Sequence, residues 1–167
     1  GYKRHPGRCV HRRAVLFVKD DLWIVVDRIA GEGTHSARLH WLAGEYPASY
    51  DAASGTMALA TPAGEFRVTV LDEQAAPLAG DVVTGRASPP RGWLSRHYAE
   101  KRPVPSLAVE RTGGAPLQLV TLLSGAPAAV EMDESGWRVA AGDARVSFRV
   151  VDGRFDAIRV ERSAEQG

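Results

Sequence analysis

The stretch RVSFRVVDGRFDAIRVER, Arg145 to Arg162, shows most clearly how this chain folds. Val146, Phe148 and Val150 alternate with other residues, which is the period-two pattern of a strand with one buried face. Asp152-Gly153 then provides the residues of a tight turn, and a second alternating arm follows it. The stretch therefore predicts an antiparallel β-hairpin.

The same pattern recurs along the chain. VEMDESGWRVAAGDARV repeats it with turns expected at Ser135-Gly136 and Gly142-Asp143, and no window carries a helical apolar stripe over three turns. We predict an all-β fold, an antiparallel β-sandwich of stacked sheets with about twelve short strands and no substantial helix. The expected strands are 10–19, 22–30, 35–43, 56–61, 65–72, 80–87, 106–112, 116–124, 127–132, 137–141, 144–151 and 155–162.

Length and charge narrow the functional classes. The 167 residues suit one domain, and 21 basic against 20 acidic residues give a net charge of +1 with no concentrated basic face. This balance argues against a nucleic-acid partner, and no apolar run is long enough for a membrane span. Cys9 is the only cysteine, so an intrachain disulfide is impossible. We expect residues 1–167 to be a single β domain that is a C-terminal fragment of a longer protein.

The first predicted hairpin, CVHRRAVLFVKDDLWIVVDRI, carries charged residues on apolar strands. His11 and Arg12 open its first arm and Asp27 closes its second. These residues could form a solvated rim, a metal site or one wall of a ligand cleft, and the arginines could pair with Asp27 across the hairpin. The pattern alone leaves these alternatives open.

A second feature is SPPRGWLSRHYAEKRPVPS, from Ser88 to Ser106, whose four prolines exclude a central strand. Long structured loops on rigid β scaffolds often carry function, and this one holds Trp93 and Tyr98. The alternative is that both aromatic rings plug one end of the sandwich.

The order of these motifs resembles the C-terminal β-sandwich domain of heparinase II/III-like polysaccharide lyases. The resemblance covers most of the chain, although Ala99 stands where that family usually has Gly. The matching positions are Gly1-Tyr2, His11-Arg12, Asp27-Arg28, His40, Trp93, Ser95, Tyr98 and Thr121-Leu122-Leu123.

The resemblance implies a function. Such enzymes cleave uronate-containing polysaccharides by β-elimination in a cleft between this domain and an N-terminal α-helical toroid, which we expect to supply most catalytic groups. The implied partners are an acidic polysaccharide and that toroid, and the implied location is the periplasm or outside the cell. We expect the chain alone to be inactive. The alternative is a non-catalytic carbohydrate-binding or interdomain support module. The substrate-binding candidates are Tyr2, His11, Arg12, Trp93 and Tyr98.

The family also suggests a structural divalent metal, zinc, held by His11, Asp27 and His40. Hairpin geometry opposes it. A two-residue loop would put His11 and Asp27 on opposite faces of the sheet. We expect a three-residue loop to restore the same face but to leave them four residues apart, about 13 Å. Only a bulge or a larger loop would then bring both to one ion.

Overall fold

The computed structural model describes residues 9–19 and 22–162 as strands joined by turns and loops, with no helix in this part of the chain. It follows that none of the described segments is a helix able to cross a membrane. The strands are β1 (Val10–Val18), β2 (Leu22–Ala30), β3 (Thr34–Leu42), β4 (Ala48–Asp51), β5 (Thr56–Thr61), β6 (Gly64–Leu71), β7 (Gly80–Thr84), β8 (Trp93–Leu94), β9 (Arg102–Pro103), β10 (Pro105–Gly114), β11 (Leu117–Ser124), β12 (Ala128–Asp133), β13 (Gly136–Ala141), β14 (Ala144–Val151) and β15 (Arg154–Arg162).

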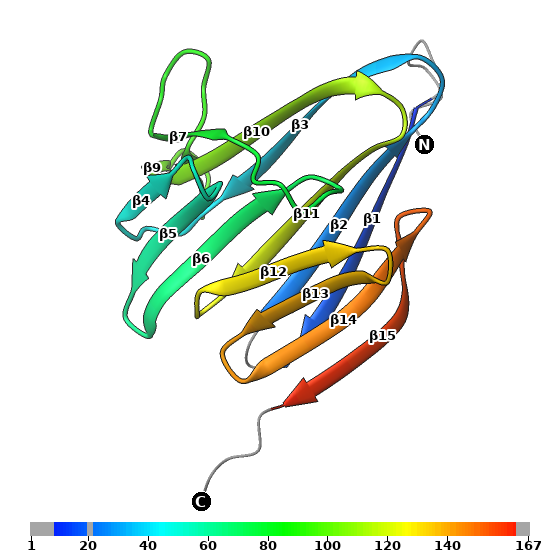
Figure 1. Ribbon diagram of the computed structural model, residues 1–167. Coiled ribbons are helices and arrows are strands. Elements are labelled where there is room, and N and C mark those ends of the chain that lie inside the picture. Colours follow the sequence, from blue (N-terminus) through cyan, green and yellow to red (C-terminus); the bar gives the residue numbers. More distant parts are fainter. Residues whose placement is uncertain (1–8, 20–21, 163–167) are drawn as a thin grey trace, which may run out of the picture.

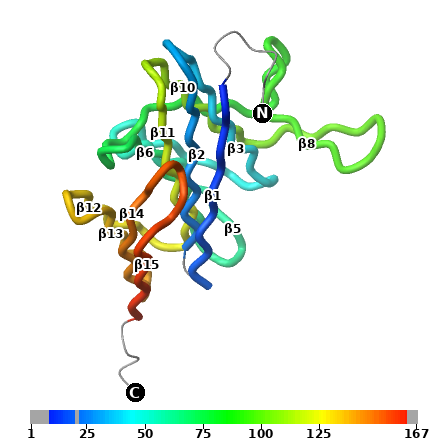
Figure 2. The backbone as a smooth tube through the Cα atoms, turned by 90° about the vertical axis from the view of Figure 1, so that its right-hand side faces the viewer, coloured from blue at the N-terminus to red at the C-terminus, as the bar shows by residue number. Residues whose placement is uncertain are grey.

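Three antiparallel sheets stack in layers, which confirms the all-β sandwich prediction (Figures 1 and 2). The middle layer is a six-stranded sheet in the order β1-β2-β11-β6-β5-β4. The four-stranded sheet β12-β13-β14-β15 packs on one of its faces and the three-stranded sheet β3-β10-β7 on the other. The remaining pair, β8 and β9, forms the base of a loop that projects from the body of the molecule (Figure 2).

Each interface between layers has its own core, because successive side chains of the middle sheet point to opposite faces. In β2, Ile24 and Val26 face the four-stranded sheet, where they meet Phe148. On the other face Leu119 of β11 packs with Leu107 of the three-stranded sheet. Residues 24–27 of β2 are buried on both faces, which explains why this part of the sequence is mostly an apolar run rather than an alternating one.

The C-terminal hairpin that predicted the fold is present, with one irregularity. Its turn is Asp152-Gly153, and both residues have positive φ, as a two-residue hairpin turn requires. Ser147 pairs with Arg159 but Arg149 pairs with Asp156, so β15 contains a β-bulge. The bulge lets Phe155 and Val160, five residues apart, point to the same face of the sheet, opposite Val150 and Val146.

Several sequence expectations need correction. The turn expected at Ser135-Gly136 is one residue earlier, because Asp133 pairs with Gly136. β4 was not predicted, and the strand expected over 80–87 ends at Thr84. The expected separation of four residues was also wrong: Arg13 pairs with Asp27, so His11 lies on the same face as Asp27 and only two residues along the ladder from the position opposite it.

Candidate functional site

The candidate site lies near the first residues of β1 and the last residues of β2, which pair with each other. Asp27 is 2% exposed although it is a carboxylate, so it needs partners that replace water. Arg13 provides two of them: its Nε donates to Oδ1 at 2.8 Å and its Nη2 to Oδ2 at 2.9 Å. This two-point contact is the geometry in which a guanidinium binds a carboxylate best.

His11 is the third member of the group. Its Nε2 donates to Asp27 Oδ1 at 2.6 Å, which fixes the orientation of the imidazole ring and turns Nδ1 away from the carboxylate. The side chains of His11 and Arg13 are 39% and 42% exposed, whereas that of Asp27 is 3% exposed. Asp27 therefore acts as a buried anchor that holds two cationic or hydrogen-bonding groups at the surface.

The three-stranded sheet contacts this group through Trp41 of β3. The guanidinium carbon of Arg13 lies 5.4 Å from the ring centroid of Trp41, a cation–π distance. Trp41 in turn donates from Nε1 to the hydroxyl of buried Thr121 at 3.2 Å. β3 thus braces the arginine from one side, so the positions of Arg13 and Asp27 are set by two sheets.

A cleft of about 480 Å³ opens beside the group. His11, Arg13 and Asp27 line one side and residues of β3 the other, among them His35. His35 has a buried Nε2 with no hydrogen-bond partner in the structure. Its neighbours Ala37 and Leu39 alternate inward with it along the strand, a pattern that sequence reasoning could have used and did not.

The contacts of Asp27 do not fit a three-ligand zinc site. Both of its oxygens accept hydrogen bonds from Arg13, and a dication would be repelled by that guanidinium. His40 reaches the rim of the cleft, but strand alternation puts its side chain on the face opposite Leu39. Within the described residues no three His, Cys, Asp or Glu side chains are grouped to hold an ion. The zinc ion stays a prediction.

His40 belongs to a different electrostatic environment. It pairs with Ala108 of β10, on the outer face of the three-stranded sheet. Desolvation, together with the guanidiniums of Arg38 and Arg91, lowers the pKa of His40 from its ordinary value, and Glu110 opposes the shift.

The other predicted substrate-binding residues lie away from the cleft. Arg12 points to the opposite face of the sheet from His11, where Nη1 donates to the carbonyl oxygen of Asp152. Trp93 is half-buried; its Nε1 donates to the carbonyl oxygen of Arg86 at 2.8 Å, and Lys101 lies over its ring at 4.3 Å.

Tyr98 is fully exposed in the loop between β8 and β9, so the idea that it plugs the sandwich is wrong. Tyr2 lies outside the described residues. The roles of Tyr2, Arg12, Trp93 and Tyr98 in substrate binding stay predictions. Of the predicted site residues within 9–19 and 22–162, the structure joins only His11 and Asp27 by a direct contact, and it adds Arg13.

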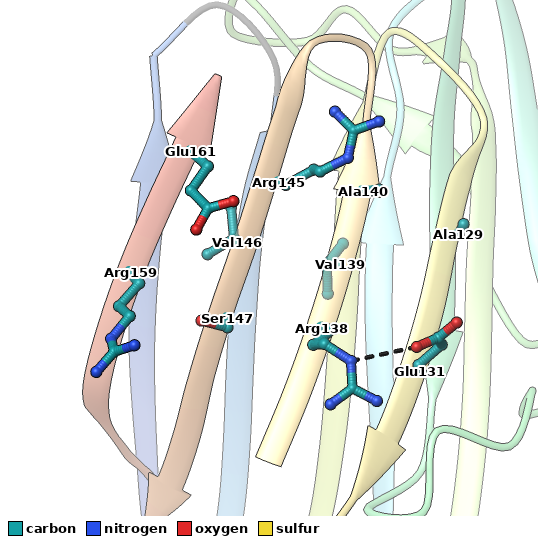
Figure 3. A pocket seen from close by; sticks show the side chains of 10 residues that line it. All are labelled: Ala129, Glu131, Arg138, Val139, Ala140, Arg145, Val146, Ser147, Arg159 and Glu161. Atoms are coloured by element: carbon teal, nitrogen blue, oxygen red, sulfur yellow. Dashed lines mark hydrogen bonds and ion pairs between the residues drawn. The ribbon is translucent and has the colours of Figure 1, made fainter. Parts of the chain in front are cut away.

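A second hollow, of about 300 Å³, lies on the outer face of the four-stranded sheet (Figure 3). Arg138 is held there by Glu131, with Nε to Oε2 at 3.2 Å, and by Asp133, with Nη2 to Oδ2 at 2.7 Å. Arg159 and Glu161 reach this face because of the bulge in β15. Acidic and basic side chains are interspersed, so this is a mixed-charge surface rather than a site for one kind of ion.

Comparisons with known proteins identify a family and several solved structures of similar fold. The family described as Heparinase II/III-like, C-terminal, matches residues 1–149. A heparan sulfate lyase HepC mutant from Pedobacter heparinus is similar in structure, with a TM-score of 0.66, 15% identity and coverage of 96% of this chain and 24% of that one. The heparinase III BT4657 gene product gives a TM-score of 0.61, 14% identity and coverage of 93% and 24%.

The chain therefore spans about a quarter of the length of these solved structures. At this level of identity the likeness concerns the fold. Comparison with curated protein sequences gives no match.

Proposed function

Because this chain belongs to the heparinase II/III-like C-terminal family, we propose that it is the β-sandwich domain of a polysaccharide lyase. In this proposal it forms one wall of the cleft in which a uronate-containing polysaccharide is cleaved by β-elimination. The rest of the catalytic apparatus belongs to an N-terminal α-helical domain of the same parent protein, meaning the longer polypeptide that includes this chain.

The group of His11, Arg13 and Asp27 is the observation that carries the proposal. β-Elimination from a uronate requires that the sugar carboxylate be neutralised, because the C5 proton is otherwise too weakly acidic to remove. The exposed edge of Arg13 offers hydrogen-bond donors at a cleft wall, His11 presents its Nδ1 beside it, and Asp27 keeps both side chains in place. They are suited to binding an anionic sugar and orienting it.

The same cleft supports the view that this chain does not act alone. A base must accept the C5 proton and an acid must protonate the leaving oxygen. Among the described residues that line the cleft there is no tyrosine, and the ring of His11 is committed through Nε2 to Asp27. The Nε2 atom of His35 is buried, and the side chain of His40 lies on the opposite face of β3. We therefore expect a group from the helical domain to remove the proton, and the 167-residue chain by itself to be inactive.

The alternative is a non-catalytic carbohydrate-binding or interdomain support module. The buried ion pair favours it in one respect, because Arg13 and Asp27 would brace β1 against β2 whether or not a sugar binds. For either role, substrates as large as polysaccharides support a periplasmic or extracellular location for the parent protein.

The test is an ultraviolet assay of the parent protein on a panel of uronans, since each β-elimination creates an unsaturated sugar that absorbs. We expect His11→Gln to lower kcat/KM about tenfold to a hundredfold, the loss expected for one charged hydrogen bond of about 1.5–3 kcal/mol. Arg149→Gln is the matched control, because Arg149 is an exposed residue of β14, on another sheet, and does not line the cleft. Silence of the folded parent on every polymer would favour the support module.

A further inference from the structure

Large apolar side chains are exposed on the half of the β1–β2 hairpin farthest from His11. Val15 is 52% exposed, Phe17 48% and Trp23 42%. The rings of Phe17 and Trp23 stack on each other, with centroids 4.0 Å apart and planes inclined by 25°. A stacked aromatic pair of this kind would gain by burial, and here its outer surface faces solvent.

These side chains continue a face that is covered elsewhere. Trp23 pairs with Leu123 of β11, and Leu123 pairs with Val68 of β6, so the three residues form one row across the middle sheet. Val68 and Leu123 belong to the core under the three-stranded sheet. That sheet therefore covers one end of the row, while Phe17 and Trp23 at the other end are left open.

A groove extends the open surface. It has a volume of about 360 Å³ and runs beside Leu123, with Leu42, Tyr46 and Phe66 among its lining residues. Leu42 is 50% exposed and Tyr46 is 40% exposed. We name the connected surface of Val15, Phe17, Trp23, Leu123 and this groove the apolar strip. Single exposed apolar residues are ordinary, but a connected strip of this kind marks an interaction surface.

The position of the apolar strip indicates what covers it. Side chains two residues apart on a strand share a face, so His11, Arg13, Val15 and Phe17 of β1 all point the same way. The first two line the candidate cleft and the last two open the apolar strip. A body that forms the opposite wall of the cleft would therefore cover the apolar strip with the same surface.

We propose that the apolar strip is the docking surface for the helical domain of the same parent protein. This inference rests on the proposed function, which supplies that domain. One support is that the apolar strip continues the wall of the cleft. The other is that the solved structures of similar fold have chains about four times as long as this one, which leaves room for a further domain in the parent protein. A helix with an apolar face suits a groove of this shape and chemistry.

Hydroxyl-radical footprinting of the parent protein tests the proposal directly. We expect Phe17 and Trp23 to be oxidised several-fold more slowly than Tyr98, which is fully exposed in the loop between β8 and β9. Trp23→Ser in the parent should make the polypeptide between the two domains several-fold more sensitive to protease. Ile158→Ser is the matched control, since Ile158 is 44% exposed on β15, and it should leave the digestion unchanged.

The outcomes separate this inference from the proposed function. Protection of the apolar strip in a parent that has no lyase activity would keep the docking surface and remove the lyase. Lyase activity in a parent whose Trp23 is freely oxidised would overturn the docking surface alone. Protection that disappears on dilution would assign the strip to contact between two copies of the protein, and would also overturn the proposal.

Discussion

Removing Arg13 should cost more stability than removing its partner, because only Asp27 is cut off from water. In Arg13→Met the carboxylate keeps the single contact from His11 while its side chain stays 3% exposed. Breaking a buried pair in this way costs about 3–5 kcal/mol, and we expect the lower end because one donor remains. For a domain of this size, about 3 kcal/mol lowers the Tm by roughly 6–12 °C.

Asp27→Asn should cost less, about 1–2 kcal/mol, because the Arg13 guanidinium is 42% exposed and can turn to water. The matched control is Arg149→Met. Arg149 contacts Asp156 at 2.7 Å, but the two side chains are 57% and 48% exposed, so its loss should cost less than about 1 kcal/mol.

The assay is thermal and urea unfolding of the 167-residue chain, followed by circular dichroism. The expected order of cost is Arg13→Met, then Asp27→Asn, then Arg149→Met. A cost for Arg13→Met no greater than that for Arg149→Met would refute the idea that a buried carboxylate anchors the site. The double variant Arg13→Met/Asp27→Leu should recover part of the loss, because no buried charge is then left without a partner.

Two other predictions concern the pKa of His40 and the predicted zinc ion. The pKa of His40 is lowered in the folded chain, so the unfolded state binds the proton more tightly. The free energy of unfolding should therefore fall as the pH drops below about 6.5, and stop falling once the pH is below the pKa of His40 in the folded chain. His40→Gln should therefore reduce the loss of stability between pH 7.5 and 5.5 in urea unfolding; an unchanged loss would contradict the shift. Chelation by EDTA should leave the Tm unchanged, because Arg13 occupies both oxygens of Asp27. A lower Tm on chelation would reinstate the predicted zinc ion.

Much of the fold could be predicted because its strands follow simple patterns. The ends of β2, β5 and β14 agree with the expected ones, since each is bounded by turn residues and filled with apolar side chains. β4 was missed because Ala48–Asp51 has no apolar alternation, and pairing with β5 alone makes it a strand. The strands β8 and β9 have two residues each, too few for any period to show.

The candidate site depended on a register that the sequence does not specify. The residues between Val18 and Leu22 allow loops of two or three residues, and the two cases put His11 on opposite faces. The pairing of Arg13 with Asp27 selects one of them. The burial of Asp27 and its two-point contact with Arg13 depend further on Trp41, which approaches from another sheet and has no sequence signal near β1.

The bulge in β15 has a consequence for insertions and deletions. Ala157 adopts a φ of 51° there, and the strand on either side keeps regular pairing with β14. Deleting one residue at this point would leave a single residue opposite Phe148, so the pairing would become regular while Arg159 stays opposite Ser147 and Val160 stays opposite Val146. A deletion in the regular part of the strand beyond the bulge would instead exchange the sides of all residues that follow. Related chains should therefore differ in length by one residue at the bulge more often than elsewhere in β15.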